Sequence, residues 1–300
     1  EYFYERFREG LAALGRSKGV GIALDPQSGE VLALLSFPAY DNNLFASPGR
    51  NAEKRAALLS PLEPLFNRAI AGLYSPGSTI KPLHAVAALA EGVVRPEREM
   101  YSPGYLDVPN PYDQEHPTRF LDWRYQGNVD LSSAIAQSSN VYFYEVGGGA
   151  EGQRGLGIER LRKWWETFGL GKPTGVDLPG EGEGFLPSIE WKEKKTGKPW
   201  LLGDTYNVSI GQGDILATPL QILNYISAIA NGGKLYELSV VESAEQPKLL
   251  ADLSYLSGEL RETRKGMREA VTASLGTAHL LSDLGFSVGA KTGTAQVRAN

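Results

Sequence analysis

Cysteine is absent from this 300-residue chain, and histidine and methionine are scarce, with three and two copies. Without cysteine there can be no disulfide, thiol nucleophile or thiolate metal site, whichever side of a membrane the chain occupies. The histidines lie far apart in the sequence and lack the spacing of metal ligands, so we expect no metal and no cofactor.

Long apolar runs and an excess of basic residues are also missing. No stretch of about 18 apolar residues, the length that a membrane helix needs, occurs, so we expect any membrane anchor to lie outside these residues. A formal net charge of −5 argues against a nucleic-acid partner. Hydrophobic residues at 42% and charged residues at 22% are ordinary values and allow a sizeable core.

A Ser-x-x-Lys tetrapeptide occurs once, from Ser78 to Lys81, where a Pro-Gly turn leads into the apolar stretch PLHAVAALA. A helix that begins near Ser78 puts positions i and i+3 on one face, so the Lys81 amine should lie beside the Ser78 hydroxyl. A neutral amine there can accept the serine proton. The alternative is that Ser78 is only a helix cap, but the apolar residues after Lys81 favour a buried base.

Two further motifs follow in the chain. Ser138, Ser139 and Asn140 precede the apolar run VYFYEV, where they could also act only as a helix cap. A Lys-Thr-Gly triplet, residues 291–293, ends the strand-like run GFSVGA. Its lysine is a candidate for the second cation that keeps the Lys81 amine neutral.

The Lys-Thr-Gly triplet has a second copy, which differs in context. Residues 195–197 lie in the charged stretch EWKEKKTGKPW and predict a solvated loop, so we assign function to residues 291–293. The stretch 285–292 also nearly matches a phosphate-binding loop, with Ala290 at its last glycine position. Such a loop needs a helix to begin at the Lys-Thr pair, which GTAQV does not favour, so we do not expect a nucleotide site.

Hydrophobic periodicity and turn residues predict an α/β fold. An antiparallel sheet built from both chain ends is expected to carry an inserted helix-rich lobe, with the cleft where they meet. The sheet lobe would comprise 1–50 and 232–300, and the mainly helical lobe 51–231. The individual elements expected are a hairpin of GVGIAL and EVLALL, helices at 2–14, 78–91, 131–148, 157–168, 218–231 and after Lys265, a loop-like rim at 102–128 and a strand at 286–291.

With its three motifs in this order, the chain resembles the transpeptidase domain of class B penicillin-binding proteins. The likeness extends to GVGIALDPQSGEVLALLSFPAYDNNLF at 19–45, to 203–222 and to GTA at 276–278. Residues 200–204 and LDW at 121–123 most resemble the elongation type, penicillin-binding protein 2. The resemblance implies the fold of penicillin-binding proteins and serine β-lactamases. It also implies a membrane anchor and a pedestal domain before these residues, and further strands after them.

The resemblance further implies a D,D-transpeptidase that crosslinks peptidoglycan stem peptides during cell-wall elongation and is acylated by penicillin at Ser78. Ser138 would relay protons between the two lysines, and Asn140 would hold a peptide carbonyl of the substrate. The implied substrate-binding residues of the last motif are Lys291 and Thr292 for the terminal carboxylate, Gly293 for a clear strand edge, and Thr294, whose backbone N–H forms an oxyanion hole with that of Ser78.

Two alternatives share these motifs. A β-lactamase or β-lactam-sensing receptor has the same scaffold, but the Glu-x-x-Leu-Asn string of class A hydrolases does not occur after Ser138. A catalytically silent wall-synthesis scaffold would not require the intact motifs. The implied partners are D-Ala-D-Ala donor and amine acceptor peptides, β-lactams and a membrane SEDS glycosyltransferase, at the extracytoplasmic face of a bacterial inner membrane.

Overall fold

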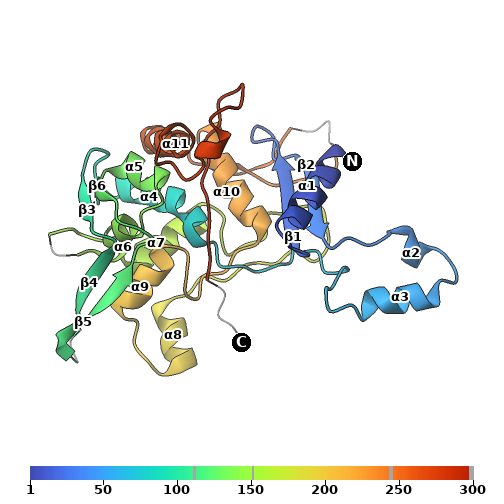
Figure 1. Cartoon of the computed structure of the whole chain (residues 1–300), viewed down its shortest axis with the longest axis horizontal. Helices are drawn as coiled ribbons and strands as arrows, with labels where there is room; N and C mark the ends of the chain where they lie inside the picture. The colour runs from blue at the N-terminus through green and yellow to red at the C-terminus, as the bar shows by residue number, and fades with distance from the viewer. Residues whose placement is uncertain (111–112, 151, 243–245, 297–300) are drawn as a thin grey trace.

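The computed structural model describes residues 1–110, 113–150, 152–242 and 246–296. Figure 1 shows a large helical part, a β-hairpin beside it that carries the N-terminal helix, and a small arm with two helices that projects outward. The helices are α1 (Tyr2–Ala13), α2 (Asn43–Ala46), α3 (Asn51–Leu58), α4 (Lys81–Ala90), α5 (Leu131–Ala136), α6 (Asn140–Gly148), α7 (Gly157–Thr167), α8 (Ile189–Thr196), α9 (Leu202–Ser209), α10 (Pro219–Asn231) and α11 (Ser257–Thr272), with 3-10 turns η1 (Gly77–Ile80), η2 (Ser254–Leu256) and η3 (His279–Leu281). The strands are β1 (Gly19–Leu24), β2 (Val31–Phe37), β3 (Met100–Ser102), β4 (Tyr105–Asn110), β5 (Asp113–Leu121), β6 (Gly127–Val129), β7 (Lys234–Tyr236) and β8 (Leu249–Asp252).

The expected N-terminal hairpin is present, with β1 and β2 paired antiparallel. Helix α1 packs closely across it because the strand has glycines there: a Cβ on Gly19 would lie 2.8 Å from a methyl carbon of Leu11. A late segment of the chain joins the same hairpin, since Val31 N–H donates to the Ser239 carbonyl at 2.7 Å. Residues from distant parts of the sequence therefore meet at β2.

The helical part is built around α4, in which Lys81 to Ala88 are all buried. Helices α5, α6, α7 and α11 pack near it, and their large apolar side chains, among them Phe143, Leu161, Trp165 and Leu260, form one cluster. Burying each such side chain stabilises a fold by about 1.5–3 kcal/mol. A packed core therefore fixes the helix that follows the Ser78 turn.

The single helix expected over 131–148 is wrong, because the chain breaks into α5 and α6 at Ser138. Ser138 has a left-handed backbone with φ of 57°. Asp130 caps α5 by accepting from Ser133 N–H at 2.8 Å, and Ser139 caps α6 by accepting from Tyr142 N–H at 3.3 Å. Apolar residues keep a helical spacing on both sides of the turn, so the sequence pattern does not reveal the break. Ser139 is the one signal, because serine favours the start of a helix.

The stretch 102–128 is not the loop that its prolines suggested. It contains the hairpin β4–β5, and β3 pairs with β6 beside it. Pro109 lies in β4 and Pro117 in β5. A two-stranded sheet consists of edge strands only, and such strands tolerate proline.

The strand expected at 286–291 is also absent, and the strands in the described residues form four two-stranded sheets, not one continuous sheet. Ala290 N–H instead donates to the Met267 carbonyl of α11 at 2.9 Å. An extended segment becomes a strand only when another strand pairs with it, and none does so among the residues described. The last helix begins at Ser257, before the expected position. Figure 1 shows the final segment, in red, running alongside α10 on the side away from the hairpin in this view.

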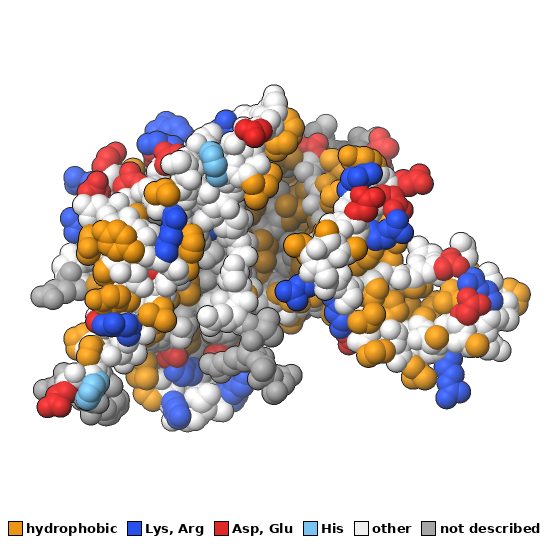
Figure 2. Space-filling view, in the orientation of Figure 1, with side chains coloured by type: hydrophobic (Ala, Val, Ile, Leu, Met, Phe, Trp, Pro, Cys, Tyr) orange, Lys and Arg blue, Asp and Glu red, His pale blue; other side chains and the backbone are white. Residues whose placement is uncertain are grey.

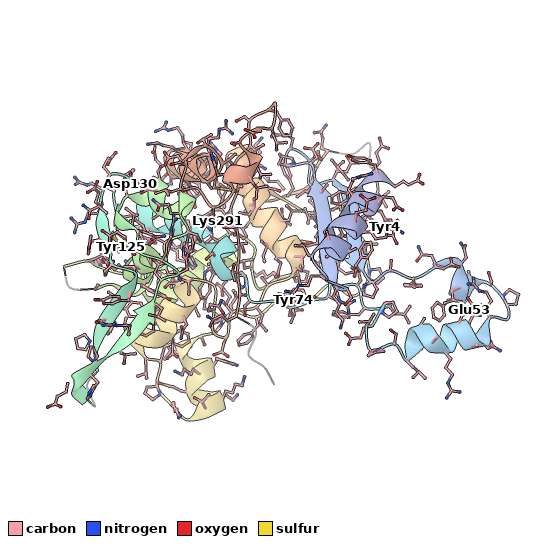
Figure 3. All side chains as sticks on the ribbon, in the orientation of Figure 1. Tyr4, Glu53, Tyr74, Tyr125, Asp130 and Lys291 are labelled. Atoms are coloured by element: carbon pink, nitrogen blue, oxygen red, sulfur yellow. The ribbon has the colours of Figure 1, made fainter. Side chains whose placement is uncertain are left out.

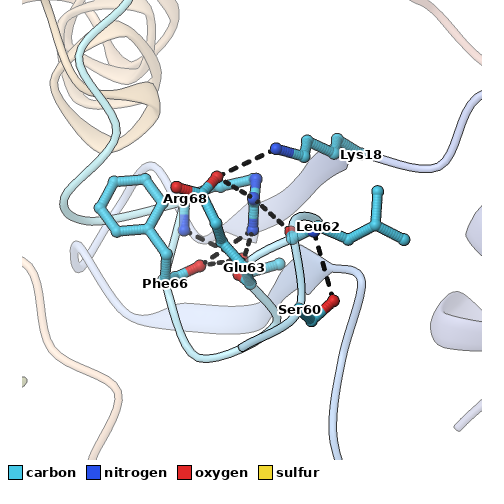
Figure 4. A network of polar contacts seen from close by, with 7 residues as sticks. Lys18, Ser60, Leu62, Glu63, Phe66 and Arg68 are labelled. Atoms are coloured by element: carbon cyan, nitrogen blue, oxygen red, sulfur yellow. Dashed lines mark hydrogen bonds and ion pairs between the residues drawn. The ribbon is translucent and has the colours of Figure 1, made fainter. Parts of the chain in front are cut away.

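The projecting arm, residues 40–66, contains α2 and α3 and exposes apolar side chains such as Phe45 and Leu58 (Figure 2). Arg68 fixes its return to the body (Figure 4). The Arg68 guanidinium is nearly buried and donates to the carbonyls of Leu62 at 2.7 Å and Glu63 at 2.9 Å, and the Glu63 carboxylate also pairs with Lys18 at 3.0 Å. This network anchors the chain just before the segment that carries Ser78.

Candidate functional site

Ser78 lies in η1, directly before α4, and is half-buried. The turn depends on two glycines: Gly77 has φ of 55°, and its N–H donates to the Gly211 carbonyl at 2.9 Å. A Cβ on Gly211 would lie only 2.1 Å from the Gly77 carbonyl oxygen, so a side chain cannot fit there. The sequence predicted a helix from Ser78 onward. A 3-10 turn followed by an α-helix still places Lys81 one turn after Ser78.

Lys81 is fully buried, and its Nζ reaches the turn between α5 and α6. Nζ donates to the Ser138 carbonyl at 2.8 Å and to Asn140 Oδ1 at 2.7 Å, and lies 3.4 Å from Ser138 Oγ. Burial above all, and also the Lys291 charge, lower the pKa of Lys81 well below its ordinary value, while the Asp122 carboxylate acts in the opposite direction. A lowered pKa makes the neutral amine available, as a general base requires.

Lys291 approaches Ser138 from the segment after α11. Its Nζ donates to Ser138 Oγ at 2.8 Å and to the Thr292 carbonyl at 2.8 Å, and burial lowers its pKa to about 7. Figure 3 shows Lys291 beside the helices of the larger part. The Ser138 hydroxyl therefore lies between the nitrogens of two lysines, where it can pass a proton from one group to another.

The last motif lies against the turn that holds Ser78. A Cβ on Gly293 would lie 2.6 Å from Thr79 Cγ2, and one on Gly77 would lie 2.5 Å from the Thr294 carbonyl oxygen. Gln212 Nε2 donates to the same Thr294 oxygen at 3.4 Å. Residues 291–294 do not form the expected strand, but they lie against the turn that contains the candidate nucleophile.

Two residues at the site, Thr277 and Asp122, had no role in the sequence prediction. Thr292 donates its hydroxyl to Thr277 Oγ1 at 2.9 Å, and Thr277 in turn donates to the Ala136 carbonyl at 3.1 Å, at the end of α5. Asp122 accepts a hydrogen bond from Asn140 N–H at 2.8 Å. The only signals in the sequence were the GTA and LDW strings that carry the family resemblance.

His84, on α4, was expected to be a packing residue, and its contacts agree with that. Its Nδ1 lies 2.9 Å from the Ser209 carbonyl, which can only accept, while Trp165 Nε1 donates to its Nε2 at 2.7 Å. The ring is therefore neutral with the proton on Nδ1. Burial lowers its pKa to about 4, and both nitrogens are occupied, so His84 cannot serve as a base. No cluster of potential metal ligands occurs in the part of the chain described.

The other Lys-Thr-Gly copy lies at the end of α8, so the expected loop is wrong, although its exposure was predicted correctly. The Lys195 ammonium lies 4.6 Å from the centre of the Trp191 ring. A neighbouring pocket of about 270 Å³, lined in part by Phe185 and Asp214, contains none of the predicted site residues. Among the helices of the described residues, none is long and apolar enough to cross a bilayer.

Comparison with known proteins identifies relatives along nearly the whole chain. It is 40% identical over 293 residues to the peptidoglycan D,D-transpeptidase MrdA of Haemophilus influenzae, covering 93% of this chain and 43% of that protein. Identity to MrdA of Escherichia coli K12 is 35% over 296 residues, covering 95% and 45%. The chain thus spans under half the length of these relatives.

Solved structures show the same relationship. Penicillin-binding protein 2 (PBP2) of Helicobacter pylori matches with a TM-score of 0.84 at 32% identity, covering 97% of this chain and 53% of that one. PBP2 of Pseudomonas aeruginosa, in complex with WCK 5153, matches with a TM-score of 0.81 at 35% identity, covering 95% and 64%. The predicted fold class and the likeness to PBP2 are confirmed. The family described as penicillin binding protein transpeptidase domain matches residues 19–300, a range that includes all three motifs, and this chain belongs to that family.

Proposed function

We propose that this chain is the catalytic domain of a peptidoglycan D,D-transpeptidase of the elongation type, a serine acyl transferase that penicillin acylates. The observation that carries the proposal is the Ser138 hydroxyl, held between the Nζ atoms of Lys81 and Lys291 at 3.4 and 2.8 Å. This arrangement provides a neutral amine and a route for the proton, on the helix that begins directly after the Ser78 turn.

In the first half-reaction, Ser78 Oγ attacks the carbonyl carbon of the penultimate D-Ala of a donor stem peptide, and Lys81 Nζ takes the hydroxyl proton. The backbone N–H groups of Ser78 and Thr294 hold the oxyanion. Loss of one such donor typically costs about 3 kcal/mol of barrier. The peptide C–N bond then breaks, the proton passes through Ser138 to the nitrogen of the leaving D-Ala, and an acyl-enzyme remains.

In the second half-reaction, an amine from a neighbouring strand attacks the ester carbonyl. It gives up a proton along the same route, and the Ser78 oxygen leaves with that proton, so the peptide crosslink forms and the enzyme is regenerated. Asn140 holds a substrate amide. Lys291 and Thr292 bind the terminal carboxylate of the donor, and Gly293 leaves room for the peptide backbone.

The base requires the burial that Lys81 has. A lysine of ordinary pKa, about 10.4, is almost fully protonated at neutral pH, so a lysine can act as a base there only if its pKa is lowered. Burial and the Lys291 charge both lower the pKa of Lys81, which supports its role as base over a role as a surface cation.

The partners and the cellular location of the protein are inferred from the matched structures. One matched structure is a complex between PBP2 and MreC from H. pylori, and another is described as a peptidoglycan synthase complex that coordinates polymerization and crosslinking. We infer that the intact protein is anchored at the extracytoplasmic face of a bacterial inner membrane and works with a SEDS glycosyltransferase. Pull-down of the full-length protein with that enzyme checks this assignment.

Incubation with a fluorescent penicillin, followed by mass mapping of the labelled peptide, tests the proposal directly. We expect one covalent adduct, on Ser78, and no adduct in Ser78→Ala, with an unchanged melting temperature as evidence that the variant folds. Labelling of another serine would overturn the site assignment.

Turnover separates the transpeptidase from the β-lactamase alternative. A transpeptidase protects its acyl-enzyme from water, so drug release should be far slower than acylation. Rapid multiple turnover of nitrocefin would favour the hydrolase, and absence of any adduct on folded protein would favour the silent scaffold.

A further inference from the structure

The Asp122 carboxylate, directly after the end of β5, accepts five hydrogen bonds. Its Oδ2 accepts from the backbone N–H groups of Asn140 at 2.8 Å and Val141 at 2.9 Å. The buried hydroxyls of Ser139 and Ser102 donate to the same oxygen at 3.1 and 3.3 Å. Trp123 N–H donates to Oδ1 at 2.8 Å. Every one of these groups is a donor, so the site is built for an acceptor-only carboxylate.

These bonds act on the turn that presents Ser138. The turn includes a serine in the left-handed backbone region, which costs about 1–2 kcal/mol for a residue other than glycine. Lys81 holds the carbonyl of Ser138 on one side, and Asp122 holds the next peptide units on the other. A carboxylate at the start of α6 also interacts favourably with the helix dipole.

We propose that Asp122 is a positioning residue for the acyl-transfer reaction, which fixes the Ser138–Asn140 turn against the two lysines. The inference rests on the proposed function and deepens it. Asp122 does not touch the reacting atoms, but its hydrogen bonds place the Ser138 hydroxyl and the Asn140 amide, and its charge faces the buried amine. The charged groups that act on Lys81 in the described residues are Lys291 and Asp122.

Asp122→Asn tests this, because asparagine keeps the shape but removes one acceptor and the charge. The second-order constant for acylation of Ser78 by penicillin should fall about tenfold or more, as expected for losing about 1.4 kcal/mol of transition-state stabilisation. Without the carboxylate the Lys81 amine becomes neutral at lower pH, so the acidic limb of the pH profile should also move to lower pH. Both readouts are taken on the same labelled protein.

Asp130→Asn is the matched control, because Asp130 also caps a helix of this region but contacts no site residue. It should lower the melting temperature and leave the acylation constant and its pH profile unchanged. Wild-type acylation by Asp122→Asn would overturn the proposal. A lower acylation constant with an unchanged pH profile would also overturn it, because a purely structural defect has that effect.

Ser139→Ala provides a second test if Asp122→Asn does not fold, because it keeps the charge and removes one bond to Asp122, together with the cap of α6. We expect a several-fold lower acylation constant with an unmoved acidic limb, and a wild-type constant would contradict the proposal. Wild-type protein that is not acylated at Ser78 refutes the proposed function itself. Acylated wild type with an unaffected Asp122→Asn variant refutes only the inference about Asp122.

Discussion

The two Lys-Thr-Gly segments have the same residues and opposite surroundings. Lys291 extends into the helical part, donates to the Ser138 hydroxyl and has its pKa lowered by burial to about 7. Lys195 lies exposed at the end of α8, over the ring of Trp191. Gly293 lies against the Ser78 turn, whereas a Cβ on Gly197 would have no atom within 4 Å. The difference teaches that the triplet has no chemistry of its own and acquires it from the groups packed around it.

Removal of the buried lysine should have the largest effect. Lys291→Ala deletes the cation for the substrate carboxylate and the charge that helps to keep Lys81 neutral. We expect the second-order acylation constant to fall about 100- to 1,000-fold, the usual range for losing one preorganised electrostatic contact. Stopped-flow or gel-based measurement with a fluorescent penicillin gives the constant, and a fall of less than about threefold would contradict this placement of the substrate cation.

The pKa of Lys291 predicts the next largest effect, a pH dependence. Because that pKa is lowered to about 7, the ammonium is present below this pH and is lost above it. The acylation constant reports the free enzyme, so it should decline as the pH rises through about 7, by up to tenfold per unit.

Lys291→Arg sharpens this prediction, because arginine stays charged at every accessible pH. The variant is expected to acylate more slowly at its optimum but to lose the alkaline decline. Lys195→Arg should keep the wild-type profile. An alkaline decline that persists in Lys291→Arg would assign the titration to another group.

The glycines allow a comparison between the two copies at the level of packing. An Ala Cβ at 293 would lie 2.6 Å from Thr79 Cγ2, and Thr79 cannot turn away easily because its hydroxyl donates to the Pro76 carbonyl at 2.7 Å. Gly293→Ala should shift the segment from the Ser78 turn and lower acylation about tenfold or more, since a displacement of 1 Å can cost about 100-fold.

Gly197→Ala should act on stability instead. Gly197 ends α8 with φ of 67° and has no atom near its missing Cβ. Alanine in this left-handed conformation costs about 1 kcal/mol, without an effect on acylation. Thermal melts and acylation constants of both variants decide the matter. Equal acylation by the two variants would mean that residues 291–294 do not hold the position described.

Local spacing predicted the pairing of Ser78 with Lys81, whereas the roles of Ser138, Asn140 and Lys291 came from the family resemblance. Ser78 and Lys81 are three residues apart, so any helical turn brings them to one face. Asp122 and Thr277 were missed because their contacts depend on the tertiary fold. Thr277 donates to the carbonyl of Ala136, which lies 141 residues earlier, and Asp122 accepts from the backbone N–H of Asn140, which lies 18 residues later. No periodicity carries such information.

The same distinction applies to the fold. The hairpin β1–β2 was predictable because its partner follows across a short turn. The run 286–291 has strand-like residues, but a strand forms only when a neighbouring strand pairs with it, and the sequence pattern of the run does not specify that neighbour. Conversely, β4 and β5 form strands despite their prolines because each pairs with the other. The helical spacing of apolar residues over 131–148 is interrupted at Ser138, where the Ser139 side chain caps the start of a new helix.

Lys195→Ala should have the smallest effect. The side chain is exposed and its ammonium contacts the Trp191 ring, an interaction worth about 0.5–1 kcal/mol at an exposed site. The Lys195 charge, in the last turn of α8, also interacts favourably with the helix dipole and stabilises the helix by roughly a few tenths of a kcal/mol in the presence of salt. We therefore expect the melting temperature to fall by no more than about 4 °C and the acylation constant to stay within about twofold of wild type. The two constants for Lys195→Ala and Lys291→Ala, measured side by side, test the comparison most directly. If Lys195 proved essential and Lys291 dispensable, the substrate would bind along α8, and the assignment of the cleft to the Ser78 turn would be wrong.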